Sequence, residues 1–165
     1  MLFRSVFVLH PHQSWCHVPA QSAQRIPDDV DTQAALFAAN METAITIVHD
    51  LRPALGEVVV VMGLGIVGLL VSWLVSRMQG VTLIAVDPLA WRRDVAQRIG
   101  ITHVAHPGDE QAMVEIISAQ RGADAVVEVS GNPSALDSAI GLLAVEGRVI
   151  VASWYGTKAA TLQLG

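Results

Sequence analysis

The chain has 165 residues, enough for one ordinary domain and too few for two full ones. Hydrophobic residues make up 52% of it and charged residues 15%, which excludes a disordered chain and is usual for α/β proteins with buried strands. A net charge of −5 without a basic block excludes a typical nucleic-acid binder, and a single cysteine, Cys16, excludes an internal disulfide. We therefore expect one core and a cytoplasmic protein.

The first fifty residues do not follow the pattern of the rest of the chain. A short strand is predicted at Val6 to Leu9, and an apolar helix from about Thr32 to Val48. An apolar run near the N-terminus is interrupted by His10 and Pro11 before the core of a signal peptide is complete, so we do not expect secretion.

Histidine and cysteine gather in the stretch HPHQSWCH. His10, His12, Cys16 and His17 are of residue types that ligate transition metals. On a strand, His10 and His12 would point to the same face. We favour a surface or packing role, because nothing else in the sequence supports a metal site there.

From Gly56 onward, β-rich runs alternate with helical segments, which predicts βαβ units and a parallel sheet. The five predicted strands are Glu57 to Met62, Val81 to Val86, His103 to Ala105, Ala125 to Val129 and Arg148 to Ser153. The predicted helices begin near Ile66, Leu89, Glu110 and Pro133 and end by Gly80, Ile99, Gln120 and Gly147, with Asn132 as the N-cap of the last. In the first helix, the residues expected to face the core are Ile66, Leu69, Leu70, Trp73 and Leu74, and Ser72 is expected to face water.

The stretch from Val58 to Ser76 contains no charge and is long enough to span a bilayer. Its first half is β-branched, glycines follow, and only then does a helical pattern begin. We therefore interpret it as strand, turn and helix, and expect no membrane partner.

Three glycines and one acid carry the clearest chemical signal. Gly63, Gly65 and Gly68 follow a predicted strand and open a helix, and Asp87 ends the next strand, as in dinucleotide-binding fingerprints. Gly63 permits the tight turn, Gly65 lets the backbone approach a pyrophosphate, and Gly68 allows close packing of helix on strand. Asp87 can accept both ribose hydroxyls and would repel the 2′-phosphate of NADP, so NAD is preferred. The alternative is an ordinary turn, with Asp87 only capping the next helix.

With these segments the chain resembles the medium-chain dehydrogenase/reductase family, specifically its zinc-type alcohol dehydrogenase-like members. The similar stretches are VVVMGLGIVGLL, AVDPLAWRR, GADAVVEVSGNPSAL, GRVIVASWYG and the upstream IPDDVDTQAALFAANMETA. The resemblance implies an α/β Rossmann fold, a doubly wound parallel sheet of about five strands with the sixth missing, and an N-terminal remnant of a β-rich substrate domain. Residues 1–50 would be part of that GroES-like domain with a connecting helix, and residues 51–165 a Rossmann domain truncated at its C-terminal end.

The resemblance also assigns cofactor-binding positions. Arg92 stands where the family places a basic residue against the adenosine ribose, although a solvated role is an alternative. By the same resemblance Val129 and Ser130 would border the cofactor, and Ala152 and Ser153 the nicotinamide carboxamide. The expected cofactor-binding residues are Gly63, Gly65, Ile66, Val67, Gly68, Asp87, Arg92, Thr46, Val129, Ser130, Ala152 and Ser153; no catalytic residue is assigned.

Glu42 stands where the polyol-dehydrogenase-like branch places a zinc-ligating Glu, in the helix before the Rossmann domain. The spacing from Glu42 to Gly63 is shorter than in that branch, so an ordinary solvated Glu is an equal alternative. Zinc needs at least three protein ligands, and the family's Cys and His positions would lie upstream of Met1. We therefore expect that this chain alone does not hold the zinc of the full-length family.

The resemblance implies the NAD-binding portion of an alcohol or polyol dehydrogenase, which moves a hydride between an alcohol carbon and NAD. Its partners would be the nucleotide cofactor, a small alcohol or polyol, and a second copy of the chain in a homodimer. The alternative is a truncated, non-catalytic module for nucleotide binding or protein interaction.

Overall fold

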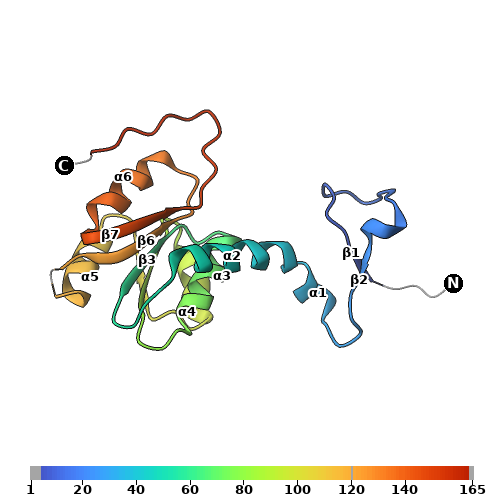
Figure 1. Ribbon diagram of the computed structural model, residues 1–165, viewed down its shortest axis with the longest axis horizontal. Helices are drawn as coiled ribbons and strands as arrows, with labels where there is room; N and C mark the ends of the chain where they lie inside the picture. The colour runs from blue at the N-terminus through green and yellow to red at the C-terminus, as the bar shows by residue number, and fades with distance from the viewer. Residues whose placement is uncertain (1–4, 120, 164–165) are drawn as a thin grey trace. The chain divides into compact units, whose positions relative to one another are not determined.

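The computed structural model describes residues 5–119 and 121–163 (Figure 1). The chain divides into two compact units, Met1–Met41 and Glu42–Gly165. Each unit is described by itself.

The first unit contains a two-stranded antiparallel sheet and two short helical segments. Strand β1 (Val6–Phe7) pairs with β2 (Gln24–Arg25), and η1 (Ala20–Ser22) precedes β2. Helix α1 (Thr32–Ala35) begins at Asp31, whose carboxylate accepts the N–H groups of two residues of the first turn. The strand that was predicted at Val6 to Leu9 is shorter than expected, because β1 ends at Phe7.

The apolar helix predicted from Thr32 to Val48 is interrupted. Leu36 and Phe37 donate to carbonyls three residues back, at 3.2 and 3.0 Å, and this tighter turn ends α1. Helix α2 (Ala38–Leu51) then begins and carries the chain into the second unit.

The second unit is a parallel five-stranded sheet in the order β5-β4-β3-β6-β7. Its strands are β3 (Val58–Met62), β4 (Thr82–Val86), β5 (His103–Ala105), β6 (Ala123–Glu128) and β7 (Leu143–Val151), and its helices after α2 are α3 (Ile66–Val75), α4 (Ala90–Arg98), α5 (Glu110–Ile117) and α6 (Pro133–Gly141). The chain runs outward from β3 to β5 and then returns to place β6 on the other side of β3. The predicted α/β Rossmann sheet is confirmed, and the strand order reverses between β3 and β6, where ligands bind in such sheets.

The central strand β3 is buried on both faces, as its run of β-branched residues predicts. Val59 and Val61 pack in one core with apolar residues of α2, α3 and α4, whereas Val58, Val60 and Met62 pack in a second core with α5 and α6. Figure 1 shows these two helix groups on opposite faces of the sheet. The uncharged stretch Val58 to Ser76 is thus strand, turn and helix, and no helix in the described part of the chain is long and apolar enough to cross a membrane.

The buried face of α3 differs from the sequence prediction. Gly68, Val71, Ser72 and Val75 are buried, while Ile66 is 52% exposed. Small side chains lie against the sheet because Gly68 brings the helix axis close to β3, and the expected larger residues after Ile66 are only partly buried beside them. The assignments of Ile66 to the core and of Ser72 to water were therefore wrong.

The end of α6 was also predicted wrongly. The helix starts at Pro133 with Asn132 as its N-cap, as expected, but it ends at Gly141, and Leu143 begins β7. Pairing with β6 shifts register after Leu143, so that Arg148 lies opposite Ala125. Glu146 within this irregular segment has a left-handed φ of 64°, which explains a turn-like sequence inside a strand.

Arg148 links three elements at the amino end of the central strand. Its Nη1 and Nη2 each donate to the Glu57 carboxylate at 2.8 Å, just before β3. Its Nε donates to the Leu51 carbonyl at the end of α2 at 2.9 Å, and Nη2 reaches the Arg52 carbonyl at 3.2 Å. Hydrogen bonding from Arg148 holds the pKa of Glu57 below its usual value of 4.5. The guanidinium therefore closes the C-terminus of α2 onto β3 and β7.

Arg148→Met is expected to lower the free energy of unfolding by about 2 kcal/mol near neutral pH, because it removes charge-assisted hydrogen bonds from a partly exposed pair. A lowered carboxyl pKa stabilises the fold above about pH 4.5, and this contribution is lost as pH falls through the lowered pKa. The part of the deficit that comes from the ion pair should therefore disappear in strong acid, while the smaller loss of the hydrogen bonds to the Leu51 and Arg52 carbonyls remains. Urea unfolding across the pH range measures both effects, with the exposed Arg98→Met as control; a deficit independent of pH would contradict the ion-pair explanation.

Candidate functional site

Two glycines bring β3, α3 and the loop after β6 into close contact. Gly63 has a left-handed φ of 105°, and a Cβ at this position would lie 2.6 Å from the Cα of Ser130. A Cβ at Gly68 would lie 1.8 Å from the Gly63 carbonyl oxygen. Any side chain at either position would force backbone apart, so both glycines are required by packing.

Gly65 is different. It is the N-cap of α3, its φ of −68° is open to any residue, and it makes no side-chain cap. Apart from its chain neighbours, no heavy atom of the described residues lies within 4 Å of where its Cβ would be. The space in front of α3 is open, and the first N–H groups of a helix lack intrahelical partners and carry partial positive charge. This end of α3 can accept an anion that comes closer than a Cβ would allow.

Asp87 joins the end of β4 to the glycine turn. Its side chain is 1% exposed; Oδ2 accepts the Leu64 N–H and Oδ1 the Leu89 N–H, both at 2.8 Å. Arg92 Nη1 lies 3.3 Å from Oδ2. The carboxylate thus accepts the N–H of Leu89, the residue just before α4, and also that of Leu64 in the glycine turn, so it does more than the alternative interpretation expected. Oδ2 therefore already accepts two donors, whereas Oδ1 keeps a lone pair for a further donor.

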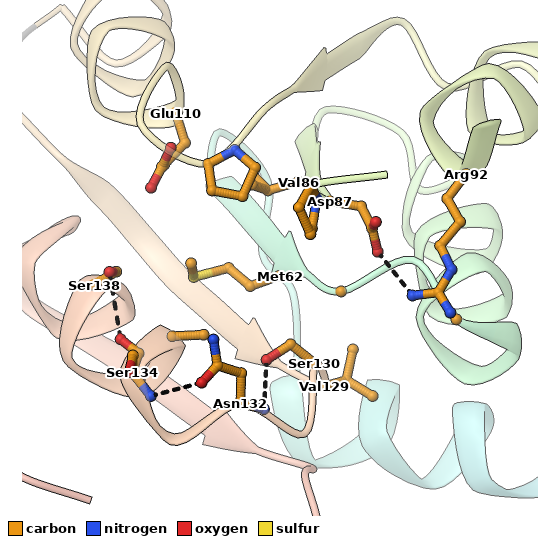
Figure 2. A pocket seen from close by; sticks show the side chains of 15 residues that line it. Met62, Val86, Asp87, Arg92, Glu110, Val129, Ser130, Asn132, Ser134 and Ser138 are labelled. Carbon is orange, nitrogen blue, oxygen red and sulfur yellow. Dashed lines mark hydrogen bonds and ion pairs between the residues drawn. The ribbon is translucent and has the colours of Figure 1, made fainter. Parts of the chain in front are cut away.

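A cavity of about 470 Å³ opens beside this turn, within the range of small-molecule sites. Its lining residues are Met62, Gly63, Gly65, Val86, Asp87, Pro88, Arg92, Pro107, Glu110, Val129, Ser130, Asn132, Ser134, Ala135 and Ser138. Figure 2 shows Asp87 and Arg92 toward one side of the cavity and Glu110 and Ser138 toward the other. The walls come from the carboxyl ends of three neighbouring strands and from the starts of α5 and α6.

The structure brings half of the sequence-predicted cofactor residues to this cavity, namely Gly63, Gly65, Asp87, Arg92, Val129 and Ser130. Ile66, Val67 and Gly68 form the first turn of α3 next to Gly65. Ala152 and Ser153 lie at the end of β7, where the Ala152 N–H donates to the Glu128 carbonyl and Ser153 Oγ accepts the Gly131 N–H, both at 2.8 Å. Thr46 is exposed on α2, donates to the Glu42 carbonyl at 3.0 Å, and does not line the cavity.

Sequence reasoning missed a buried carboxylate beneath the loop after β6. Glu128 is fully buried and accepts the N–H of Ser130 at 2.8 Å, its hydroxyl, and the hydroxyl of Tyr155. Burial, and then the hydrogen bond to Glu128, raise the pKa of Tyr155 to about 12, so the phenol keeps its proton and donates it to this bond. Glu128 therefore holds the Ser130 backbone against which Gly63 packs. Its place in an apolar strand gave no sign of this role.

The described residues contain no group of three or more His, Cys, Asp or Glu placed to hold a metal ion. Glu42 is exposed on α2, and His10, His12, Cys16 and His17 are exposed in the first unit. These side chains do not fit a zinc site by themselves.

A parallel sheet with a glycine turn after its central strand, an acid after the next strand, and a cavity at the switch point defines the class of Rossmann domains. A sequence profile of the zinc-binding dehydrogenases matches residues 67–165. The chain belongs to the zinc-binding dehydrogenase family. The matched region is the family's cofactor-binding portion.

Individual relatives agree with this assignment. The D-guloside 3-dehydrogenase of Escherichia coli K12 is 30% identical over 144 residues, which cover 86% of this chain and 41% of that protein. An alcohol dehydrogenase of Escherichia coli CFT073, solved with NADH, superposes with a TM-score of 0.74 at 20% identity, covering 88% of this chain and 43% of that one. A zinc-binding dehydrogenase of Sinorhizobium meliloti 1021, solved with NADP, gives 0.72 at 25% identity, covering 88% and 44%. The chain spans less than half of each of these proteins.

Gly65→Ala and Gly68→Ala should differ in their effect on stability, because a Cβ meets open space at Gly65 and backbone atoms at Gly68. Gly68→Ala is expected to lower the free energy of unfolding by about 3 kcal/mol, because its Cβ meets backbone. Gly65→Ala should change it by no more than about 1 kcal/mol, because the conformation is allowed and the space is empty. Denaturant unfolding measures both, and an equal loss in the two variants would show that Gly65 is also needed for packing.

Proposed function

We propose that this chain is the NAD-binding portion of an alcohol or polyol dehydrogenase, which transfers a hydride between an alcohol carbon and NAD. The observation that carries the proposal is Gly65, a glycine that neither backbone conformation nor packing requires, at the open N-terminus of α3. A pyrophosphate lying on the helix N-terminus accounts for it.

The proposed cofactor path follows the carboxyl edge of the sheet. The pyrophosphate lies against Gly65 and the amides of Ile66, Val67 and Gly68. The adenosine ribose binds Asp87, and the adenine enters the cavity beside Val86. The nicotinamide half extends the other way, toward a second group of residues: Val129, Ser130, Ala152, Ser153 and, on α2, Thr46.

Asp87 favours NAD over NADP in this proposal. Two backbone N–H groups hold its carboxylate at the turn, so it cannot move away from a ribose phosphate. Arg92 Nη1 is 3.3 Å from Oδ2 of Asp87, and its positive charge partly offsets the repulsion between this carboxylate and a ribose phosphate. The Nη1 of Arg93 donates instead to the carbonyls of Asp87 and Pro88, at 2.7 and 2.9 Å.

When bound, NAD supplies the hydride acceptor. The residues of this chain bind and orient it: the α3 N-terminus holds the phosphates, Asp87 the ribose, and the loop on Glu128 borders the nicotinamide side. The proposal for the whole protein has four further parts. Glu42 is one ligand of a zinc ion, and residues 1–50 belong to a substrate domain. The protein forms a homodimer and is located in the cytoplasm.

Binding of ADP-ribose, measured by isothermal titration, tests the pyrophosphate site. Gly65→Ala should weaken it at least about tenfold while the variant stays folded, because the new Cβ occupies the phosphate position. Gly141→Ala is the matched control, since a Cβ at Gly141 also meets open space but lies at the far end of α6. Unchanged binding by Gly65→Ala, or no binding by the wild type, would refute the proposal.

The preference for NAD is tested with ADP-ribose that carries a 2′-phosphate. The additional phosphate should weaken binding about tenfold or more at low salt, because it meets the fixed Asp87 carboxylate. Arg92→Gln should widen this difference by removing the partly compensating charge. Equal or tighter binding of the phosphorylated ligand by the wild type would show that Arg92 dominates and that NADP is the cofactor.

A further inference from the structure

Glu110 lies at the end of the cavity away from Arg92 (Figure 2). It is the first residue of α5, and only 7% of it is exposed. Its carboxylate accepts the Gly108 N–H through Oε2. Charged side chains are rarely buried to this extent without a partner or a function.

A role at the helix start alone does not account for the burial of Glu110. An acid in the first turn interacts with the helix dipole equally well from the surface. Asp109, the residue before it, is exposed and makes no side-chain cap. The chain thus places one acid of this pair in solvent and turns the other to the cavity.

The surrounding walls suit a flat base with polar edges. Apolar side chains at Met62, Val86, Pro107 and Val129 line the cavity. Helix α6 contributes a polar side through Ser134 and Ser138, and Figure 2 shows Ser138 and Glu110 approaching the cavity from different helices. Hydroxyls donate or accept, whereas a carboxylate only accepts.

We propose that Glu110 reads the base of the bound nucleotide, by accepting a hydrogen bond from the exocyclic amino group of adenine. The inference rests on the proposed nucleotide-binding function and adds a specificity-determining residue to it. Gly108 engages Oε2, which leaves Oε1 for the base.

The chemistry of the purine edge gives the selectivity. Adenine carries an amino donor at position 6, and hypoxanthine carries a carbonyl acceptor there. A carbonyl oxygen that faces the Glu110 carboxylate cannot pair with it, because both are acceptors, and the two oxygens repel each other. The hydroxyls of Ser134 and Ser138, by contrast, can pair with either base. Selection therefore depends on Glu110 and not on the polar side of α6.

ADP and IDP titrated into the full chain by calorimetry form the test, because they differ only on this edge of the purine: adenine has an amino group at position 6 and an acceptor at N1, and hypoxanthine has a carbonyl at position 6 and an N–H at N1. Wild type should bind ADP about 10- to 100-fold more tightly than IDP. In Glu110→Gln, the amide oxygen can still accept the Gly108 N–H, and the amide nitrogen then offers a donor to the base. The ADP preference should therefore disappear or reverse. Glu115→Gln, on the exposed side of the same helix, should keep it.

Each outcome decides something. Equal binding of ADP and IDP by wild type overturns the role of Glu110 and leaves the proposed function standing, whereas binding of neither overturns both. A preference that persists in Glu110→Gln also overturns it, because the selection would then come from elsewhere. If circular dichroism shows that Glu110→Gln does not fold, the wild-type ratio decides alone.

Discussion

The geometry of the cavity depends on close backbone contacts of the glycine turn with helix α3 and with the loop after β6. Gly63 lies against the backbone of Ser130, and Gly68 against the carbonyl of Gly63, with no room for a side chain at either position. These contacts fix the distance from β3 to α3 and to the loop after β6. As a result the N-terminus of α3, the end of β4 and the end of β6 open onto one cavity.

Three buried carboxylates also hold the loops at this edge of the sheet in place. Asp87 accepts a backbone N–H from the turn, Glu128 one from the Ser130 loop, and Glu110 one from the segment before α5. Loops at the end of a sheet leave N–H groups without ladder partners, and a charged acceptor satisfies them strongly. Asp87 and Glu110 also line the cavity, so these two carboxylates can face hydroxyl and amino donors of a ligand, whereas Glu128 is fully buried and only supports the loop.

Much of the second unit could be predicted from the sequence because its signals are local. The β-branched run predicts strand β3, and the glycines after it predict a turn. Asn132 and Pro133 predict the start of α6. Each of these signals lies within a few residues of the chain. The buried face of α3 could not be predicted, because hydrophobicity points to Ile66 while the close approach at Gly68 decides which side meets the sheet. The extent of β7 was missed for a similar reason, since its pairing to β6 begins before an irregular turn.

In the site, the signature residues were predictable and the second half of the cavity was not. Glu110 and Ser138 lie on helices separated by β6 in the chain, and only the sheet order, with β6 returning beside β3, brings them to one space. Asp87 shows why a signature acid can have two roles at once. Its bond to Leu64 already holds the turn, so under the proposed function the acceptor for the ribose would be in place before the ligand binds, and this loop would not need to rearrange. For the same reason a substitution of Asp87 would change the turn as well as the proposed recognition, whereas a substitution of Gly65 would meet only open space and, under the proposed function, would change recognition alone.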